Sequence, residues 1–207
     1  DFLSNITLLV FHKDLIEGLS LGLHIGDYSF FDYYKQEALH VSCREKTLIL
    51  QRFEDIQNEL GRPIDRHSRV LLCKNIELLL DHCVRFYERQ FILREDEIRH
   101  ILQKSDKMLD EYFEEKRTPR LGLPTAAYCA EQFGYSQAYL LDGLKFCTGK
   151  TWHEYTQAKR ISIAKRWLQE EHRTIPQITK DLGFSSAKYF CRLFKEVVGY
   201  GPDEILN

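Results

Sequence analysis

Apolar side chains recur every three or four positions through most of the chain, a spacing that predicts amphipathic α-helices. In the central part this pattern predicts a helix from Ser42 to about residue 60, a longer helix over 65–90 and a third over 95–115. Ser42 and Glu45 fit a capping box, which marks the start of the first of these helices. Because only about four residues separate the first helix from the second, the two are expected to form an antiparallel hairpin.

Residues 1–40 lack a long helical pattern. Short apolar runs alternate with glycines there and predict strands over 6–12 and 28–33. The sequence begins with Asp1-Phe2-Leu3, inside an apolar run and without an initiator methionine. Because a protein rarely begins inside its core, we expect a fragment whose front half is absent. The predicted fold class is mainly α, with a small β remnant near the start.

The helical pattern breaks at 116–120, which predicts a boundary between a domain over 1–117 and a domain over 118–207. The second domain contains an internal repeat, in which residues 129–149 resemble residues 178–199. The offset is 49 residues up to a serine in each copy and 50 residues after it, so the second copy holds one extra residue.

Each copy consists of a predicted helix, a Gly-aromatic-Ser turn and a second helix. The turns are Gly134-Tyr135-Ser136 and Gly183-Phe184-Ser185. Glycine suits the left-handed backbone at a helix end, the aromatic side chain fills the corner, and the serine is expected to cap the next helix. A helix over 152–170 joins the copies. Since a helix presented by such a turn fits the major groove, the repeat predicts two DNA-binding helix-turn-helix units.

Composition and the lack of certain motifs argue against several classes of protein. The net charge of −2 is unevenly divided, because residues 118–207 hold 12 Lys and Arg against 9 Asp and Glu, whereas residues 1–117 hold 17 against 22. The six cysteines form no CxxC pair and the eight histidines no HxxxH or HExxH spacing, so we expect free thiols, no metal and no cofactor. No nucleophile–base pair or phosphate loop is present, which disfavours an enzyme. No apolar run approaches the ~18 residues of a membrane span.

From 122 to 206 the chain resembles the AraC-type (AraC/XylS) transcription regulators. The most specific string has the pattern LGF-S-S…YF-x-R-x-FK-x-x-x-G-x-x-P and runs from Leu182 to Pro202. The AK-x-x-L element, which begins at Ala164, lies in the helix between the two turns. Upstream, the stretches YSFFDYYKQEALHVS and RFYERQF look like the end of a cupin-type sensor domain followed by dimerisation helices.

The resemblance implies an effector-controlled regulator that binds double-stranded DNA in a bacterial cytoplasm, at the nucleoid, and that is not a membrane protein. It further implies a homodimer formed through residues 40–117 and a small-molecule effector held in an absent N-terminal domain. On this interpretation 1–117 is the C-terminal part of a sensor and dimerisation domain, and 118–207 is the DNA-binding domain. That domain is expected to contain two three-helix units joined by a linker helix.

Within this resemblance, six residues of the second recognition helix are expected to face DNA: Ser186, Ala187, Lys188, Cys191, Arg192 and Lys195. The three basic residues among them are spaced i, i+4 and i+7, so they share one face of the helix. Lys188 and Arg192 are expected to approach base edges or phosphates, and Lys195 to grip the DNA backbone. The opposite face is expected to be core: Phe190, Leu193, Phe194 and Val197.

The first recognition helix differs in the residues that it would present to DNA, which are Gln137, Ala138, Leu141, Asp142 and Lys145. Asp142 is repelled by phosphates but can accept a hydrogen bond from a cytosine amino group, while Ala138 and Leu141 can touch thymine methyl groups. Alternatively, this helix reads few bases and positions the protein through Gln137, Tyr139 and Lys145. Both interpretations remain open, and Asp142 together with the weak positive charge also allows an interaction adaptor with weak, non-specific DNA binding.

Overall fold

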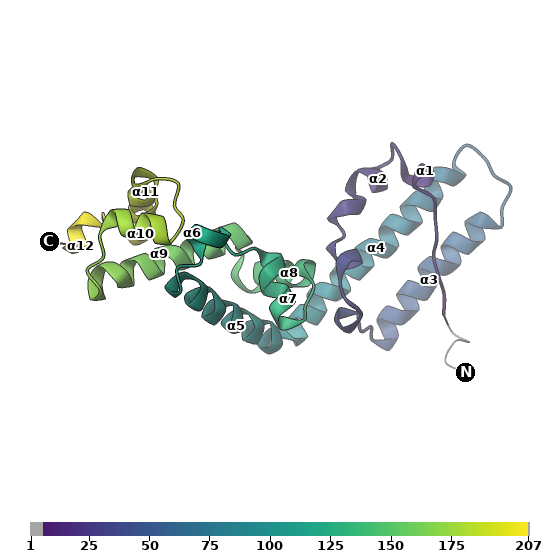
Figure 1. Cartoon of the computed structure of the whole chain (residues 1–207). Helices are drawn as coiled ribbons and strands as arrows, with labels where there is room; N and C mark the ends of the chain where they lie inside the picture. The colour runs from purple at the N-terminus through teal and green to yellow at the C-terminus, as the bar shows by residue number, and fades with distance from the viewer. Residues whose placement is uncertain (1–5, 207) are drawn as a thin grey trace. The chain divides into compact units, whose positions relative to one another are not determined.

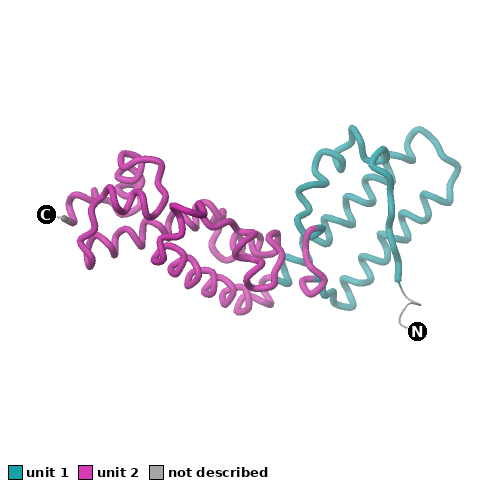
Figure 2. The backbone as a smooth tube through the Cα atoms, in the orientation of Figure 1, with its two compact units in different colours: residues 1–31, 38–90 teal, residues 32–37, 91–207 magenta. Residues whose placement is uncertain are grey.

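The computed structural model describes residues 6–206, and this part of the chain is mainly α-helical without a strand (Figure 1). It forms two compact units (Figure 2). Unit 1 comprises the described residues up to Phe31 together with Ala38–Gln90, and unit 2 comprises Asp32–Glu37 together with the described part of 91–207. The mainly α fold class is therefore confirmed.

Unit 1 is built on two long helices, α3 (Cys43–Leu60) and the greater part of α4 (Ser68–Leu93). The predicted capping box starts α3, because the Ser42 hydroxyl accepts from the Glu45 amide while the Glu45 carboxylate accepts from the Ser42 amide. Glu45 also pairs with Arg89 at 2.6 Å, which joins the start of α3 to the end of α4 in this unit. The two helices are thus antiparallel, as predicted (Figure 1).

Short elements precede α3. Those that contribute to the core of unit 1 are α1 (Lys13–Ile16), α2 (Ser20–His24) and the 3-10 helices η1 (Ile25–Asp27) and η2 (Ser29–Asp32). A further 3-10 helix, η3 (Lys35–Glu37), lies in unit 2. Leu21 packs with Ile56 of α3 and with Ile76 and Leu79 of α4.

The predicted β structure is not confirmed. Residues 6–12 have no regular structure, and Ile6, Leu8 and Val10 are exposed. Residues 28–33 contain the 3-10 turn of η2. A strand needs a neighbour for its backbone N–H and C=O groups, and the described residues offer none to either segment. The Phe2 and Leu3 positions of the expected apolar run lie outside the described residues.

From Glu95 onward, the described part of unit 2 contains eight α-helices that share one hydrophobic core. They are α5 (Glu95–Glu114), α6 (Thr118–Leu121), α7 (Ala126–Phe133), α8 (Gln137–Thr148), α9 (Trp152–Glu170), α10 (Ile175–Asp181), α11 (Ala187–Val198) and α12 (Asp203–Leu206). Leu109 and Phe113 of α5, Leu144 of α8, Trp167 of α9 and Phe190 of α11 are fully buried in this core.

Helix α5 belongs with the C-terminal elements, although the sequence pattern places it before the predicted boundary at 116–120. It packs on α7, α8 and α9. The Tyr155 hydroxyl donates to Asp106 at 2.8 Å, and Lys159 pairs with Asp110 at 2.9 Å, so polar contacts reinforce the apolar face. The compact units thus divide at residue 90, and the functional division at 117 stays a prediction.

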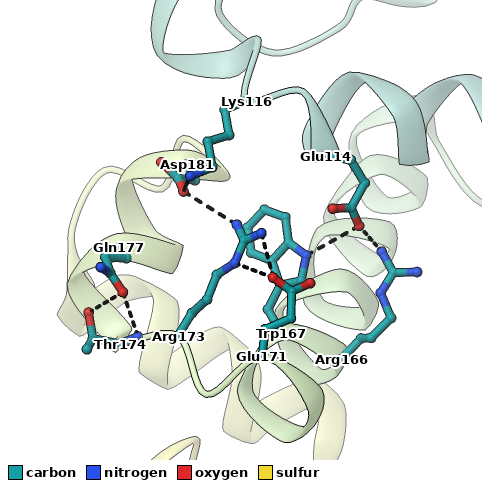
Figure 3. A network of polar contacts seen from close by, with 9 residues as sticks. All are labelled: Glu114, Lys116, Arg166, Trp167, Glu171, Arg173, Thr174, Gln177 and Asp181. Atoms are coloured by element: carbon teal, nitrogen blue, oxygen red, sulfur yellow. Dashed lines mark hydrogen bonds and ion pairs between the residues drawn. The ribbon is translucent and has the colours of Figure 1, made fainter.

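A polar network surrounds Trp167 and ties α9 to its neighbours (Figure 3). Glu114 of α5 accepts from the Trp167 indole at 3.3 Å and pairs with Arg166. The Arg173 guanidinium lies 3.8 Å from the centre of the Trp167 ring and pairs with Asp181 of α10 at 3.6 Å. These contacts join α9, the helix that links the two copies of the repeat, to α5 on one side and to α10 on the other.

Candidate nucleic-acid interface

The first helix-turn-helix unit consists of α7, a short turn and α8. Gly134 ends α7 in the left-handed conformation, with a φ of 73°. Ser136 then caps α8, since its hydroxyl accepts from the Tyr139 amide at 3.1 Å. The turn is therefore built as the sequence predicts, with a glycine for the reversal and a serine for the cap.

The second unit consists of α10, its turn and α11. Gly183 has a φ of 70°, again left-handed. The cap of α11, however, is Ser186 and not the predicted Ser185, because the Ser186 hydroxyl accepts from the Tyr189 amide at 3.1 Å. The extra residue of the second copy thus lies in the turn, before the cap.

Arg160 of α9 braces the second turn, a role that the sequence patterns did not reveal. It is 3% exposed, donates to the Leu182 carbonyl at 2.8 Å, and lies 3.7 Å from the centre of the Phe184 ring. Burial lowers the pKa of the Arg160 guanidinium to about 10. Since Leu182 and Phe184 flank Gly183, this side chain fixes the corner from which α11 begins.

Helix α11 presents the expected residues on its surface. Lys188, Arg192 and Lys195 are exposed, and no carboxylate of the described chain pairs with any of the three. Ser186 and Ala187 are exposed as well, and Cys191 is partly buried. The result is an unneutralised basic stripe along one helix face.

The opposite face of α11 enters the core, with one exception. Phe190 and Phe194 are fully buried, and Leu193 is partly buried against the same cluster. Val197 is 54% exposed, so its assignment to the core is wrong. It lies in the last turn of the helix, where Gly199 already redirects the chain.

Helix α8 presents a different surface. Gln137 and Lys145 are exposed, whereas Ala138, Leu141 and Asp142 are partly covered. Tyr139 is only 1% exposed and packs among Tyr33, Phe91 and Tyr135, so it cannot position the protein on DNA as one interpretation required.

Part of this cover comes from residues 32–37, here called the strap, which belong to unit 2. The Tyr33 hydroxyl donates to the Asp142 carboxylate at 2.6 Å. The Glu37 carboxylate accepts from both the amide and the hydroxyl of Ser136, each at 2.6 Å. Gln36 donates to the Gly134 carbonyl at 2.9 Å. The strap therefore contacts the turn and the predicted DNA-facing side of the first recognition helix.

Two further features bear on the chemistry. All six cysteines are free, and Cys73 and Cys129 are buried. No helix in the described part of the chain has the length and apolar character needed to cross a membrane.

Comparison with known proteins agrees with this geometry. A family described as "Helix-turn-helix domain" matches residues 129–207. The chain is 30% identical over 98 residues to the probable transcriptional regulator LumQ of Photobacterium leiognathi, covering 46% of this chain and 37% of LumQ. It is 30% identical over 95 residues to AdaA of Bacillus subtilis, a bifunctional transcriptional activator/DNA repair enzyme, covering 46% of this chain and 44% of AdaA.

The match to the regulatory protein SoxS of Salmonella typhimurium has 32% identity over 75 residues, which is 36% of this chain and 70% of SoxS. The chain thus spans less than half the length of LumQ and AdaA, and most of SoxS. The overlap with AdaA lies in the helix-turn-helix region, so the family points to transcription regulation and not to an enzyme. The chain belongs to the AraC-type family of DNA-binding, helix-turn-helix transcription regulators.

Proposed function

We propose that this regulator is sequence-specific and that α11 is its main reader of DNA bases. The unneutralised stripe of Lys188, Arg192 and Lys195 on an exposed recognition-helix face is the observation that carries the proposal. Arg is the residue best suited to a bidentate contact with guanine in the major groove, and lysine side chains neutralise phosphates. We assign base contacts to Arg192 and Lys188, and a backbone contact to Lys195. Ser186, Ala187 and Cys191 complete the surface that faces DNA.

We assign to α8 a weaker share of the recognition. Its counterparts of Lys188 and Arg192 are Ala138 and Asp142, neither of which can donate a hydrogen bond to guanine. Gln137 and Lys145 remain available for phosphates, and Leu141 for a thymine methyl group. Both helices of this pair would enter adjacent major grooves when the protein is fully engaged.

The linker helix constrains that engagement. With 19 residues, α9 is ~28 Å long at 1.5 Å per residue. Successive major grooves on one face of straight B-DNA lie ~34 Å apart. Binding by both units therefore favours bent DNA, and straight DNA favours unequal engagement.

Self-association is assigned to unit 1. The resemblance implied a homodimer through residues 40–117, but α5 buries its apolar face inside unit 2. The apolar side chains that remain exposed on the two long helices of unit 1 are Leu50 and Leu60 on α3 and Val70, Leu71, Leu78 and Val84 on α4. Such exposed apolar side chains are a usual basis for a symmetric dimer. A small-molecule effector, if the protein carries a sensor domain, would act from the N-terminal side, in a bacterial cytoplasm.

Selection of bound sites from a random duplex library with the whole chain tests this proposal. We expect a defined consensus, and with about six phosphate contacts an affinity that falls ~10³-fold between 50 and 200 mM salt. Arg192→Ala should reduce binding to the consensus, whereas Arg44→Ala, at an exposed position in the first turn of α3, should not. A salt-insensitive complex, or recovery of no consensus, would instead support the adaptor alternative.

A further inference from the structure

We propose that the strap, residues 32–37, is an intramolecular ligand of the first helix-turn-helix unit, and that it must leave before that unit can bind DNA. The inference rests on the proposed function only in taking α8 as a DNA-facing helix. It adds that this helix is masked by the protein's own chain in the conformation described above.

The contacts fall on the groups that DNA would need. Ala138, Leu141 and Asp142 are the base-facing positions of α8, and the Tyr33 hydroxyl holds the last of these. Asp32 and Tyr34 of the strap line a shared pocket with Gln137, Ala138 and Leu141. A helix that enters a major groove must present these side chains to the bases, so the strap and the DNA compete for one surface.

The strap also carries the charge that DNA carries. The Glu37 carboxylate is 1% exposed and accepts from three donors: the Tyr34 amide, the Ser136 amide and the Ser136 hydroxyl. Backbone amides and hydroxyls at a helix N-terminus are the groups that bind DNA phosphates. Glu37 thus occupies the place of a phosphate oxygen at the start of α8.

Nearby carboxylates strengthen the mask. Asp32 lines the pocket beside α8, and Asp142 lies under the Tyr33 hydroxyl. While the strap is in place, this surface combines three acidic side chains, Asp32, Glu37 and Asp142, with two exposed cations, Lys35 of the strap and Lys145 of α8. The net negative charge of this surface opposes an approaching DNA phosphate, and departure of the strap makes the surface less negative, because two carboxylates leave with one lysine.

We expect the first unit to keep its fold without the strap, although the Tyr33 ring packs against the same core. Leu140 and Leu144 of α8 are buried in a core supplied by α5, α7 and α9. Ser136 caps α8 through its own hydroxyl, independently of Glu37. The family match to residues 129–207 also lies wholly outside the strap. Removal of the strap should therefore expose the helix without unfolding it.

Connectivity makes the strap a means of control. Phe31 before it and Ala38 after it both belong to unit 1. A rearrangement of unit 1, caused by an effector or by self-association, would pull on six residues that are bound to the first recognition helix. Two states that differ in DNA affinity and in strap position are what a ligand needs to shift a regulator between them.

Two conservative substitutions test the mask. Tyr33→Phe removes the hydroxyl that binds Asp142 and keeps the aromatic ring against Tyr139. Glu37→Gln removes the charge that mimics a phosphate. Matched controls are Tyr34→Phe, whose hydroxyl has no hydrogen-bond partner in the described chain, and Glu54→Gln, at an exposed position of α3. All variants are made in the whole chain and bound to the selected site.

Hydroxyl-radical footprinting gives the decisive readout, because it resolves the half-site of each unit. We expect the parent chain to protect the α11 half-site alone, and the Tyr33→Phe/Glu37→Gln double variant to protect both. Release of charge-assisted hydrogen bonds should tighten binding roughly tenfold or more. The two controls should bind as the parent does, and the thermal midpoint of the double variant should stay within a few degrees of the parent.

Protection of both half-sites by the parent chain would overturn the proposal, as would an unchanged footprint in the double variant. Weaker binding together with a lower thermal midpoint would mean that the strap supports the fold of the unit, which also contradicts a mask. Arg192→Ala on the same site keeps the two proposals separate. If that change leaves the α11 half-site protected and the affinity unaltered, the proposed function fails, while the strap result is still judged on the α8 half-site.

Discussion

The two helix-turn-helix units of this protein share one construction and differ in the surface that they present. In each unit a left-handed glycine ends the first helix, a serine caps the second, and aliphatic or aromatic side chains on the inner face enter a common core. Yet α11 exposes a basic stripe, whereas the corresponding face of α8 holds Asp142 and is partly covered by residues 32–37.

This difference shows that the turn and the contact surface are separate parts of the motif. The turn is fixed by backbone geometry, which leaves few choices of residue at the glycine and the cap. The outward side chains are less constrained by the turn, so the contact face is basic in one copy and carries one aspartate and one lysine in the other. Duplication of the helix-turn-helix scaffold therefore does not by itself duplicate the charge of the exposed helix face.

The largest contrast between the units is expected at their turn glycines. Both have positive φ, so alanine costs about 1–2 kcal/mol at either position for the backbone alone. At Gly183 a Cβ would also lie 2.3 Å from the Cγ2 of Thr118, whereas nothing lies within 4 Å at Gly134. Thr118 is buried and β-branched, so it cannot easily move aside. We expect Gly183→Ala to lower the free energy of unfolding by roughly 3 kcal/mol or more, and Gly134→Ala by about half as much.

Urea unfolding followed by circular dichroism measures both losses. Thr118→Ser removes the obstructing methyl group and keeps the hydroxyl, so it should restore part of the stability of Gly183→Ala and none of that of Gly134→Ala. Equal losses at the two glycines, or no rescue by Thr118→Ser, would show that the close approach of α6 to the second turn does not affect the free energy of unfolding.

The sequence predicts elements with strong local signals and misses contacts between distant residues. The capping box of Ser42 and Glu45 predicts the start of α3, and the helix indeed begins at Cys43. The predicted cap of α11 at Ser185 is wrong, because the backbone places the cap one residue later, at Ser186. Strands over 6–12 and 28–33 fail because alternating apolar residues predict a strand only where a partner strand exists.

In the candidate site, too, the sequence predicts features that depend on local spacing and misses those that depend on distant contacts. Periodicity along α11 correctly places Lys188, Arg192 and Lys195 on the exposed face, because helix faces follow from spacing alone. No local pattern reveals that Glu37 caps a turn 99 residues away or that Arg160 braces the second corner. Those contacts depend on how helices pack, which a single sequence does not encode in any short window.

The second largest contrast is expected between the effects on DNA binding of substitutions in α11 and in α8. Arg192→Ala removes a potential bidentate base contact, so we expect a loss of about 1–3 kcal/mol in discrimination, confined to one half of the site. Asp142→Ala removes an acidic group from α8 and should leave affinity unchanged or slightly higher, since its charge opposes phosphate. Titration of both variants against the selected site and a set of single-base variants measures the two effects.

The same titration shows whether Asp142 repels phosphates or accepts a hydrogen bond from a cytosine. Acceptance of a hydrogen bond from a cytosine would make Asp142→Ala weaken binding to the best site and spare its single-base variants. A tenfold specific loss for Asp142→Ala with a neutral Arg192→Ala would reverse the order of the two units and make α8 the main reader.

The smallest expected contrast concerns two lysines at equivalent positions, Lys145 on α8 and Lys195 on α11. Both are exposed, and both lie in the last turn or two of their helices. If only α11 engages DNA fully, Lys195→Gln should make the slope of log K against log salt shallower by about 0.9, the value for one phosphate contact, while Lys145→Gln leaves it unchanged. Mobility shifts at four or more salt concentrations resolve this difference. Slopes reduced equally by both substitutions would mean that both helices grip the backbone, and that the units differ only in how they read bases.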